Sequence, residues 1–466
     1  MIDPGLAREA LDAALAAGGE RSELYWERSV GTSIRLDGGR IEEAAGGVDV
    51  GVGISVADGD LVLFANGNSV DRDGLLALAE RLARAVGKER SAHAVDPRPS
   101  PQRIVSPVTI PPSSVPTSQK VAVLRRAEDA ARRYDPRVTQ VTCQYREAER
   151  SIVVAGSDGL FAPDHRTYVT LTVTAVARER DLIRTGYEAS SETRGFELFE
   201  LNPPEETARE AARQAVLQLD AKPAPAGTFT VVLSSRAGGT MIHEACGHGL
   251  EADFIEKGLS IYAGRLGQQV ASALVTVVDD GTLPNRRGTT AIDDEGTPSS
   301  RVVLIERGVL RGFLHSRRTA RRFRVTPTGN GRRESYRHLA VPRMRNTMIV
   351  PGEADPASIL AGVADGIYIC RMGGGEVDVA AGNFVFHCSE AYRIREGRVA
   401  EPLRDATLIG NGPEVLSTID AVGSDLGFGV GTCGKEGQHV PVADAQPTLR
   451  IPRIVVGGVE PAGGTR

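Results

Sequence analysis

The pattern of apolar and polar positions in the first half of the chain repeats twice. In each pass, a helix with apolar residues at every third or fourth position precedes strand-like alternation, and a second helix follows. The predicted helices span residues 4–17, 71–87, 118–134 and 205–219, and the predicted strands span residues 24–36, 41–65, 138–155 and 166–178. Helices that alternate with strands are typical of a sheet covered by helices. The first half is therefore predicted to be an α/β domain with a mixed sheet.

Proline-rich segments interrupt this pattern at two places. Seven prolines fall within residues 96–116, which excludes a helix and favours an extended connection. The second segment, residues 222–227, reads KPAPAG and has the composition of a domain linker. We therefore predict two domains, residues 1–222 and residues 223–466.

The second half of the chain has a different pattern. Glycine, proline and Asp-Gly turns crowd between short β-rich runs, and one helix is predicted, over residues 238–257. The β-rich runs are residues 270–278, 301–315, 347–350, 384–395 and 448–456. This pattern predicts a mostly antiparallel β domain, barrel-like or sandwich-like, that carries one functional helix. The fold class predicted for the whole chain is α+β.

Composition narrows the classes of function. The chain has 466 residues, 41% of them hydrophobic, and its 55 basic and 60 acidic residues are interspersed and give a net charge of −5. This balance argues against a general nucleic-acid binder or a polybasic membrane binder. No apolar run reaches the roughly 18 residues that a membrane span needs, and the N-terminus lacks the pattern of a signal peptide. Five cysteines without a CxxC pair indicate a reducing cytoplasm rather than a disulfide framework.

The predicted helix of the second half contains a histidine motif. Residues 243–248 read HEACGH, an HExxxH arrangement. In the zinc-protease motif HExxH, both imidazoles lie on one helical face and reach one ion. A spacing of five residues turns the second ring away by about 140° on a regular α-helix. A π-bulge brings both rings back to nearly one face, and Gly247 and Gly249 loosen the backbone there.

We therefore predict a bulged or terminating helix over residues 243–248. The alternative is a regular helix with one packed histidine and one solvated histidine. Two histidines are also too few for zinc, which needs a third protein ligand and an open position for water. The other histidines, the cysteines and the carboxylates are all candidates for that ligand. Cys433 stands out because the glycines of GVGTCGKEG (429–437) allow a close approach, and Lys435 is expected to help ionise its thiol.

The chain resembles the TldD/PmbA family of metallopeptidases, specifically its TldD-type catalytic subunit. The resemblance rests on the early block GGRIEEAAGGVDVGVGISV (38–56) and on a series of blocks that follow in the order expected for the family. These blocks are HEACGHGLEADF (243–254), VVDDGTLPNRRGTTAIDDEGTP (277–298), PTGNGRRESY (327–336), GGGEVD (373–378), ATLIGNGPEVL (406–416), GVGTCGKEGQ (429–438) and QPTLRI (446–451). PmbA-type partners lack the histidine motif, which this chain keeps.

This resemblance implies a zinc (Zn2+) site formed by His243, His248 and Cys433, with Glu244 as the general base. It implies a peptidase that hydrolyses peptide bonds of small or unfolded peptides, in which zinc and Glu244 activate water. It also implies a dimer, either a homodimer or a heterodimer with a PmbA-like subunit, that encloses the active site. Cys246 departs from the small aliphatic residue expected in the family, and His387 stands where a small polar residue is more usual.

Several further residues have a functional and a structural interpretation. Arg332, Arg333 and Tyr336 follow a glycine turn and either clamp substrate and polarise the scissile carbonyl, or pin the turn through salt bridges. The acidic runs DDG (279–281) and DDEG (293–296) match no EF-hand spacing and are interpreted as turns. The GGG of residues 373–375 lacks the context of a phosphate loop, and its expected use is close approach to a peptide at a sheet edge.

Two other functions remain open at the level of the sequence. The chain fits a tailoring enzyme of peptide-natural-product biosynthesis that uses the same zinc site. It also fits a non-hydrolytic peptide-binding partner subunit, although the intact set of ligands argues against this alternative. Nothing in the sequence distinguishes a peptidase from a tailoring enzyme.

Overall fold

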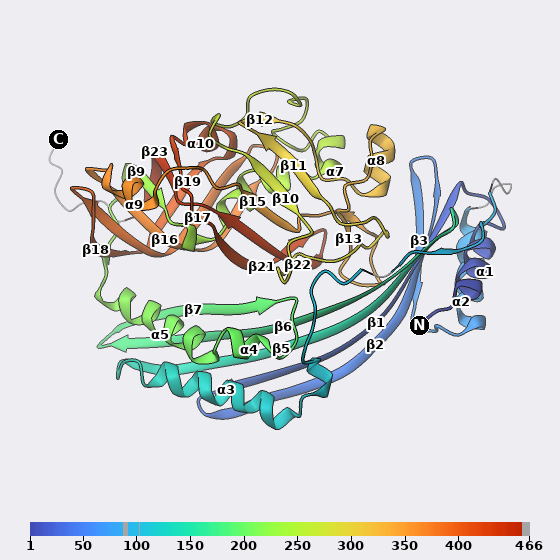
Figure 1. Cartoon of the computed structure of the whole chain (residues 1–466), viewed down its shortest axis with the longest axis horizontal. Helices are drawn as coiled ribbons and strands as arrows, with labels where there is room; N and C mark the ends of the chain where they lie inside the picture. Colours follow the sequence, from blue (N-terminus) through green and yellow to red (C-terminus); the bar gives the residue numbers. More distant parts are fainter. Residues whose placement is uncertain (87–91, 102, 459–466) are drawn as a thin grey trace.

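A long, curved sheet forms the first half of the molecule in the computed structural model, which describes residues 1–86, 92–101 and 103–458 (Figure 1). Its seven strands follow the order β3-β2-β1-β5-β6-β4, with β7 also paired to β6, and all pairs are antiparallel except β4 with β6. The strands are β1 (Arg21–Asp37), β2 (Arg40–Asp58), β3 (Leu61–Gly67), β4 (Arg98–Pro99), β5 (Val138–Gly156), β6 (Leu160–Glu179) and β7 (Leu182–Glu192).

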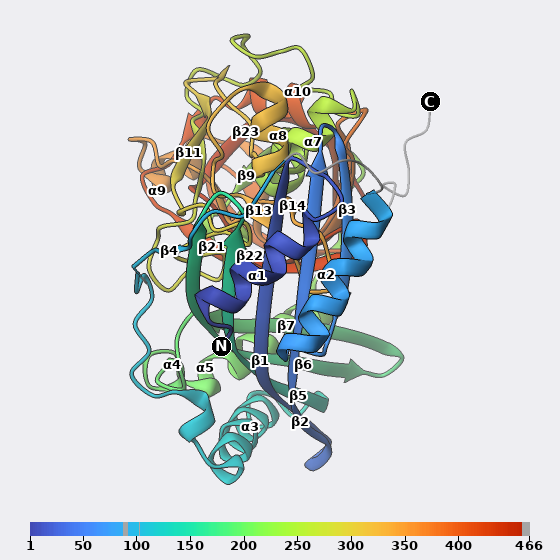
Figure 2. The ribbon, with the colours of Figure 1, turned by 90° about the vertical axis from the view of Figure 1, so that its right-hand side faces the viewer.

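One face of this sheet is covered by helices. The helices are α1 (Pro4–Ala14), α2 (Arg72–Val86), α3 (Thr117–Arg132), α4 (Leu198–Leu201) and α5 (Pro204–Asp220), and a 3₁₀ turn spans Pro112–Ser114. Near α1 and α2 the sheet contributes Leu24 and Trp26 to an apolar cluster, and near α3 and α5 it contributes Ile34 and Tyr145 to another. Figure 2 shows the two helix pairs at different heights along the same strands. Strand alternation therefore fixes which side chains face the helices.

The opposite face of the sheet packs against the second half of the chain. Tyr25 and Ile152 from this face form an apolar cluster with Ile292 and Tyr336 of the second half. A fully buried ion pair joins Arg166 on β6 to Asp294, with 2.6 Å between the guanidinium nitrogen and the carboxylate oxygen. The two halves thus share a packed interface.

Two large sheets form most of the second half. One has eight strands, in the order β16-β9-β23-β19-β17-β18-β8 with β20 beside β23, and the other has six, in the order β12-β11-β10-β15-β22-β21. Their strands are β8 (Lys222–Pro223), β9 (Gly227–Leu233), β10 (Val277–Asp280), β11 (Arg301–Glu306), β12 (Val309–Leu310), β15 (Asn346–Ile349), β16 (Asp365–Asp378), β17 (Asn383–Arg395), β18 (Arg398–Arg404), β19 (Ala406–Asn411), β20 (Ala421–Val422), β21 (Gly427–Lys435), β22 (Gln438–Gln446) and β23 (Leu449–Gly457). The short strands β13 (Gly331–Arg332) and β14 (Val341–Pro342) pair with each other.

Short helices connect these strands, and one apolar core joins the two sheets. The helices are α6 (Thr240–Ile242), α7 (Ala252–Glu256), α8 (Arg317–Phe323), α9 (Pro356–Ala361) and α10 (Gly412–Thr418), with a 3₁₀ turn at Ser235–Ala237. The core includes Val231 of β9, Ile349 of β15 and Met241 of α6. Segment α6 is therefore held between the two sheets.

The structure confirms the predicted α+β class and corrects individual elements. The four helices predicted in the first half are present within a few residues of their expected ends. β7 was not predicted, and the run at 270–278 becomes a strand only from Val277. No helix within residues 1–86, 92–101 and 103–458 is long and apolar enough to cross a membrane.

Candidate metal centre

The helix that carries the histidine motif is distorted at the motif itself. α6 is followed by a π-helical turn over His243–Gly247 and then by a 3₁₀ turn over His248–Leu250. Glu251 is extended, with φ −75° and ψ 123°, and α7 begins after it. The predicted bulge is confirmed, whereas the prediction of one helix over 238–257 is wrong, because the π turn and the extended Glu251 divide it.

Close packing surrounds the π-helical turn. A Cβ atom on Gly247 would lie 2.1 Å from the sulfur of Met344, and one on Gly412 would lie 2.2 Å from the carbonyl oxygen of Ala245. The hydroxyl of Tyr262 donates a hydrogen bond to that same carbonyl over 2.8 Å. The two glycines leave room for the irregular backbone because they have no side chain. The Tyr262 hydroxyl supplies a hydrogen bond to a carbonyl group of the π turn.

The π turn brings both histidines to a cysteine on a distant strand. One ligand atom from each of His243, His248 and Cys433 lies within 4.8 Å of the others, and all three residues are largely buried. Cys433 lies on β21, and its sulfur is 3.4 Å from Nε2 of His248. The two imidazole rings are 4.9 Å apart and nearly perpendicular, at 84°. The three side chains predicted as ligands therefore converge on one point.

The electrostatics of this point favour a thiolate. Burial by itself raises the pKa of the Cys433 thiol, but hydrogen bonding to His243 and His248 outweighs burial and lowers the pKa to about 5. A thiolate with two neutral imidazoles is a three-ligand set that suits zinc and leaves a fourth position open. The donor set thus fits a zinc ion.

Carboxylates lie behind both histidines. Nδ1 of His248 is 3.0 Å from Oε2 of Glu251, and Nδ1 of His243 is 3.7 Å from Oδ2 of Asp444. A hydrogen-bonded carboxylate such as Glu251 fixes the ring orientation and the tautomer of a metal-binding histidine, whereas Asp444 approaches His243 without forming a hydrogen bond. Lys435 was expected to act on the Cys433 thiol, but its ammonium group lies 3.0 Å from Glu251 and 2.7 Å from Asp253. It therefore stabilises the carboxylates behind the site, and that expectation is corrected.

These supporting residues were not found from the sequence. Glu251 stands three residues after His248, a spacing that brings side chains together on a helix and was the one available signal. Asp444 is about 200 residues from His243 and carries no local signal. It reaches the site because β22 pairs with β21, the strand of Cys433.

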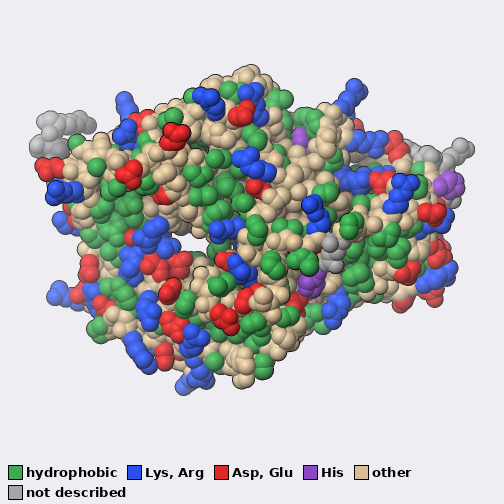
Figure 3. Space-filling view, in the orientation of Figure 1, with side chains coloured by type: hydrophobic (Ala, Val, Ile, Leu, Met, Phe, Trp, Pro, Cys, Tyr) green, Lys and Arg blue, Asp and Glu red, His purple; other side chains and the backbone are tan. Residues whose placement is uncertain are grey.

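Glu244 and the ligands line a cavity of about 980 Å³ between the two halves of the chain. β7 lines the cavity from the first half, and β16 and β21 line it from the second half. Figure 3 shows a hollow between these halves. Burial raises the pKa of Glu244 above its usual value, although the neighbouring histidines oppose the rise. Gly373–Gly375, expected to approach a peptide, also line the cavity.

The three residues considered for substrate binding are held by partners within the protein. Arg332 donates to the carbonyl groups of Met344 and Pro441, over 2.6 and 2.7 Å. Arg333 pairs with Glu23 over 2.6 Å. All three side chains are buried, and none of them lines the cavity of Glu244. Their role in substrate binding stays a prediction, and the observed contacts are those of the structural interpretation.

Tyr336 and the two residues that depart from the family pattern also lie outside the metal centre. The Tyr336 hydroxyl lies 3.2 Å from Asp49 on β2. The Cys246 thiol is buried beside the Ile242 carbonyl, and burial raises its pKa strongly. His387 is an exposed residue of β17 and does not line the cavity.

Sequence models of one family match most of the chain. The PmbA/TldA metallopeptidase domain 1 matches residues 22–86, the central domain matches residues 110–219, and the C-terminal domain matches residues 226–458. A protein of Haemophilus influenzae named metalloprotease TldD homolog is 39% identical over 94% of this chain and 92% of its own length. A metalloprotease of Methanothermobacter thermautotrophicus is 36% identical over 92% of this chain and 93% of its own length.

Solved structures share the fold. A protein of Thermotoga maritima, described as a suggested modulator of a DNA gyrase, superposes with a TM-score of 0.78 at 22% identity, over 94% of this chain and 96% of its own. TldE from Thermococcus kodakarensis superposes with a TM-score of 0.75 at 18% identity, over 97% of this chain and 99% of its own. These similarities establish the arrangement of the sheets.

Proposed function

The chain belongs to the PmbA/TldD family of metallopeptidases, and on that premise we propose that it is a zinc-dependent peptidase for small or unfolded peptides. The observation that carries the proposal is the convergence of His243, His248 and Cys433 beside Glu244 in one cavity. Zinc bound by these ligands would lower the pKa of water towards neutrality and polarise the scissile carbonyl.

Glu244 is the general base in this proposal. It follows His243 directly and lines the same cavity, which supports its carboxylate as the acceptor of a proton from the attacking water. The raised pKa of Glu244 brings the group closer to neutral pH, which favours return of that proton to the leaving amine. Asp444 and Glu251 would hold the two imidazoles in the orientation that ligation requires.

The wall formed by β16 supports an extended peptide as the substrate. β16 pairs with β17, and their register shifts between Met372 and Gly375, so the regular ladder is interrupted at the cavity. The interruption at Gly373 and Gly374 supports pairing with a peptide by strand addition, which reads backbone more than side chains. This arrangement favours unfolded substrates over folded ones.

We also propose that the chain works as a dimer, as the family resemblance implies. The partner is either a second copy of the chain or a PmbA-like subunit. Light scattering of the purified chain, alone and with such a subunit, distinguishes the two. A monomer under both conditions would refute this part of the proposal.

Substitution of the general base tests the reaction. The Glu244→Gln protein should retain zinc, because Glu244 is not a ligand, and should lose peptide cleavage by at least about a hundredfold. The His243→Ala protein should lose both zinc and cleavage. Metal content is measured by elemental analysis, and cleavage of an unstructured peptide library is measured by mass spectrometry. The matched control is Glu42→Gln on the exposed part of β2, which should behave as the wild type.

The outcomes separate the alternatives. An active Glu244→Gln protein would refute the mechanism, and a wild-type protein that binds zinc and peptides without cleaving them would support a binding subunit. Cleavage restricted to one modified precursor peptide would support a tailoring enzyme.

A further inference from the structure

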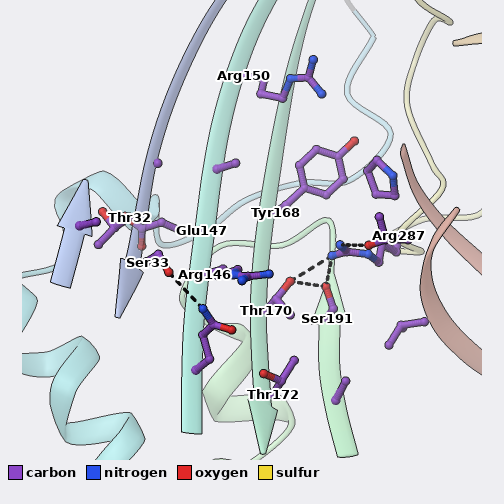
Figure 4. A pocket seen from close by; sticks show the side chains of 18 of the residues that line it. Thr32, Ser33, Arg146, Glu147, Arg150, Tyr168, Thr170, Thr172, Ser191 and Arg287 are labelled. Atoms are coloured by element: carbon purple, nitrogen blue, oxygen red, sulfur yellow. Dashed lines mark hydrogen bonds between the residues drawn. The ribbon is translucent and has the colours of Figure 1, made fainter. Parts of the chain in front are cut away.

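A second cavity, of about 660 Å³, lies next to the metal centre. Its floor is the face of the first-half sheet that points away from the helices, and its opposite wall is β21 with Arg287 (Figure 4). The two cavities share five lining residues, which are Tyr187, Ala189, Val430, Gly431 and Thr432. The short β21 segment before Cys433 therefore separates the second cavity from the metal ligands.

The floor of this cavity is unusually polar. Ser33 on β1, Arg146 on β5, Thr170 on β6 and Ser191 on β7 stand opposite one another in the register and form one row across four strands. Further along β5, the same face is apolar and packs against the second half through residues such as Ile152. The change from apolar to hydroxyl-bearing and charged side chains coincides with the position of the cavity.

Two guanidinium groups in the cavity have no carboxylate partner. The side chain of Arg146 is exposed and forms no hydrogen bond or ion pair with any residue that the structure describes. In Figure 4 its side chain extends over β6, on the side of Thr170. Arg287 is held by neutral oxygens, at 3.0 Å from the Thr170 hydroxyl and 3.0 Å from the Gly431 carbonyl. Burial lowers the pKa of Arg287, and the charge of Arg146 lowers it further.

The other charges that line the cavity are compensated. Glu147 is the one carboxylate among the described lining residues, and it is paired with Lys120 on the helix-covered side over 2.6 Å. Arg150 is paired with Glu27 over 2.8 Å. The positive charge of Arg146 and Arg287 is therefore left uncompensated, in a cavity lined by hydroxyl groups that donate hydrogen bonds.

We propose that this second cavity is a subsite for a carboxylate of the peptide substrate, with Arg146 as its anchor. The proposal rests on the peptidase function proposed above. Arg287 binds the carbonyl of Gly431, two residues before Cys433, and two residues of extended strand span about 7 Å. Arg146 lies one strand further away, opposite Thr170, which Arg287 also contacts, so a carboxylate held here belongs to a residue at least about two or three positions from the scissile bond. Both the C-terminus of a short peptide and an acidic side chain supply this chemistry.

Binding to the inactive protein tests the subsite without requiring cleavage. Zinc-loaded Glu244→Gln protein is titrated by calorimetry with an alanine-serine peptide that ends in a free carboxylate. The same peptide with a C-terminal amide, and an amidated version with one internal glutamate, are titrated in parallel. Arg146→Gln, added to Glu244→Gln, should weaken binding of a carboxylate-bearing peptide about tenfold and leave the neutral amide unchanged. Arg146→Lys should retain part of the affinity.

The matched control removes the same charge elsewhere. Arg125 is an exposed arginine of α3, on the helix-covered side, and Arg125→Gln should leave all affinities unchanged. The peptide whose affinity responds to Arg146→Gln identifies the source of the carboxylate. Equal binding of all peptides by both proteins, or no binding of any peptide, would overturn the subsite. Selective binding by a wild-type protein that cleaves nothing would refute the peptidase function and leave the subsite standing.

Discussion

At the scale of the residue, the proposed zinc site depends on groups that are not among its three proposed ligands. Glu251 is fully buried, accepts from Nδ1 of His248, and is itself held by Lys435. Burial raises the pKa of Glu251, but Lys435 and His248 outweigh it and lower the pKa to about 2. An ionised carboxylate here fixes the His248 ring with Nε2 towards Cys433.

Glu251→Gln is therefore expected to weaken zinc binding about 10- to 100-fold while leaving the three ligands in place. The neutral amide removes the charge that orients His248 and leaves the ammonium of Lys435 undercompensated. Zinc affinity is measured by competition with a chromogenic chelator. The control is Glu256→Gln at the end of α7, which is expected to bind zinc normally. Unchanged affinity in Glu251→Gln would show that the ring is oriented by packing alone.

A second buried carboxyl group predicts a pH dependence. Burial, followed by repulsion from Glu23 and Asp293, raises the pKa of Glu295 to about 8. The folded protein therefore binds a proton that the unfolded chain releases at a pKa near 4.5, so stability falls as the pH rises between these values. The contribution of this group amounts to at most about 1.4 kcal/mol per pH unit.

Glu295→Gln should remove this fall in stability with rising pH, so the variant should gain most stability over the wild type at pH 8. The free energy of unfolding, measured by urea titration between pH 5 and pH 8, should vary less with pH in the variant than in the wild type. Glu306→Gln, in an exposed pair with Arg311, is the control and should not alter the profile. If the free energy of unfolding falls with pH as steeply in the variant as in the wild type, Glu295 is ionised in the folded protein over this pH range.

The sequence singles out the proposed ligands better than the residues that surround them. His243, His248 and Glu244 form one short motif, and Cys433 is marked by its glycines and by the family resemblance. Glu251 and Asp444 are ordinary acidic residues until the fold places them behind the rings. Arg146 is equally unremarkable in the sequence, because its environment arises from pairing between four separate strands.

At the scale of the element, the π-helical turn was predictable from the requirement that both histidines of the motif reach one ion. Two imidazoles five residues apart meet one ion only if the helix gains a residue at that point. Strand β21 was not predicted, because glycines alternate along it in place of the apolar residues that mark a strand. Strand β16 was not predicted either, although Ile367–Cys370 is apolar, and its glycines begin at Gly373. The glycines of both strands let the backbone lie close to the cavity, because they have no side chain. The same lack of side chains weakens the strand pattern in the sequence.

Tyr262 supports the π turn through its hydrogen bond to the Ala245 carbonyl. Tyr262→Phe should cost about 1–3 kcal/mol, because that buried carbonyl loses a donor. The loss should also weaken zinc binding, since the turn holds His243 and His248 together. The measurements are urea unfolding and chelator competition. Tyr134→Phe, at an exposed site after α3, is the control. A loss of stability without a change in zinc affinity would show that this hydrogen bond does not determine the positions of His243 and His248.

At the scale of the whole molecule, the metal centre lies in a cavity that both halves line. The first-half sheet contributes β7, and the second half contributes the ligands. Two buried ion pairs join the halves, Arg166 with Asp294 and Arg333 with Glu23. Within the first half, Arg166 also contacts Asp164. Burial raises the pKa of Asp294, but Arg166 and Arg150 outweigh it and lower the pKa to about 2. The charge of Asp294 thus depends on arginines from the other half of the chain.

Arg166→Leu should therefore destabilise the protein by about 3–5 kcal/mol, because it leaves buried carboxylates without their partner. The loss should be smaller at acid pH, where Asp294 of the variant can take up a proton, and larger at neutral pH. Calorimetry should show a lower midpoint at neutral pH, and two transitions if the halves separate before they unfold. Arg395→Leu removes an exposed pair with Glu401 and should leave stability nearly unchanged. An Arg166→Leu midpoint equal to that of the wild type at all pH values would mean that apolar packing alone holds the two halves around the cavity.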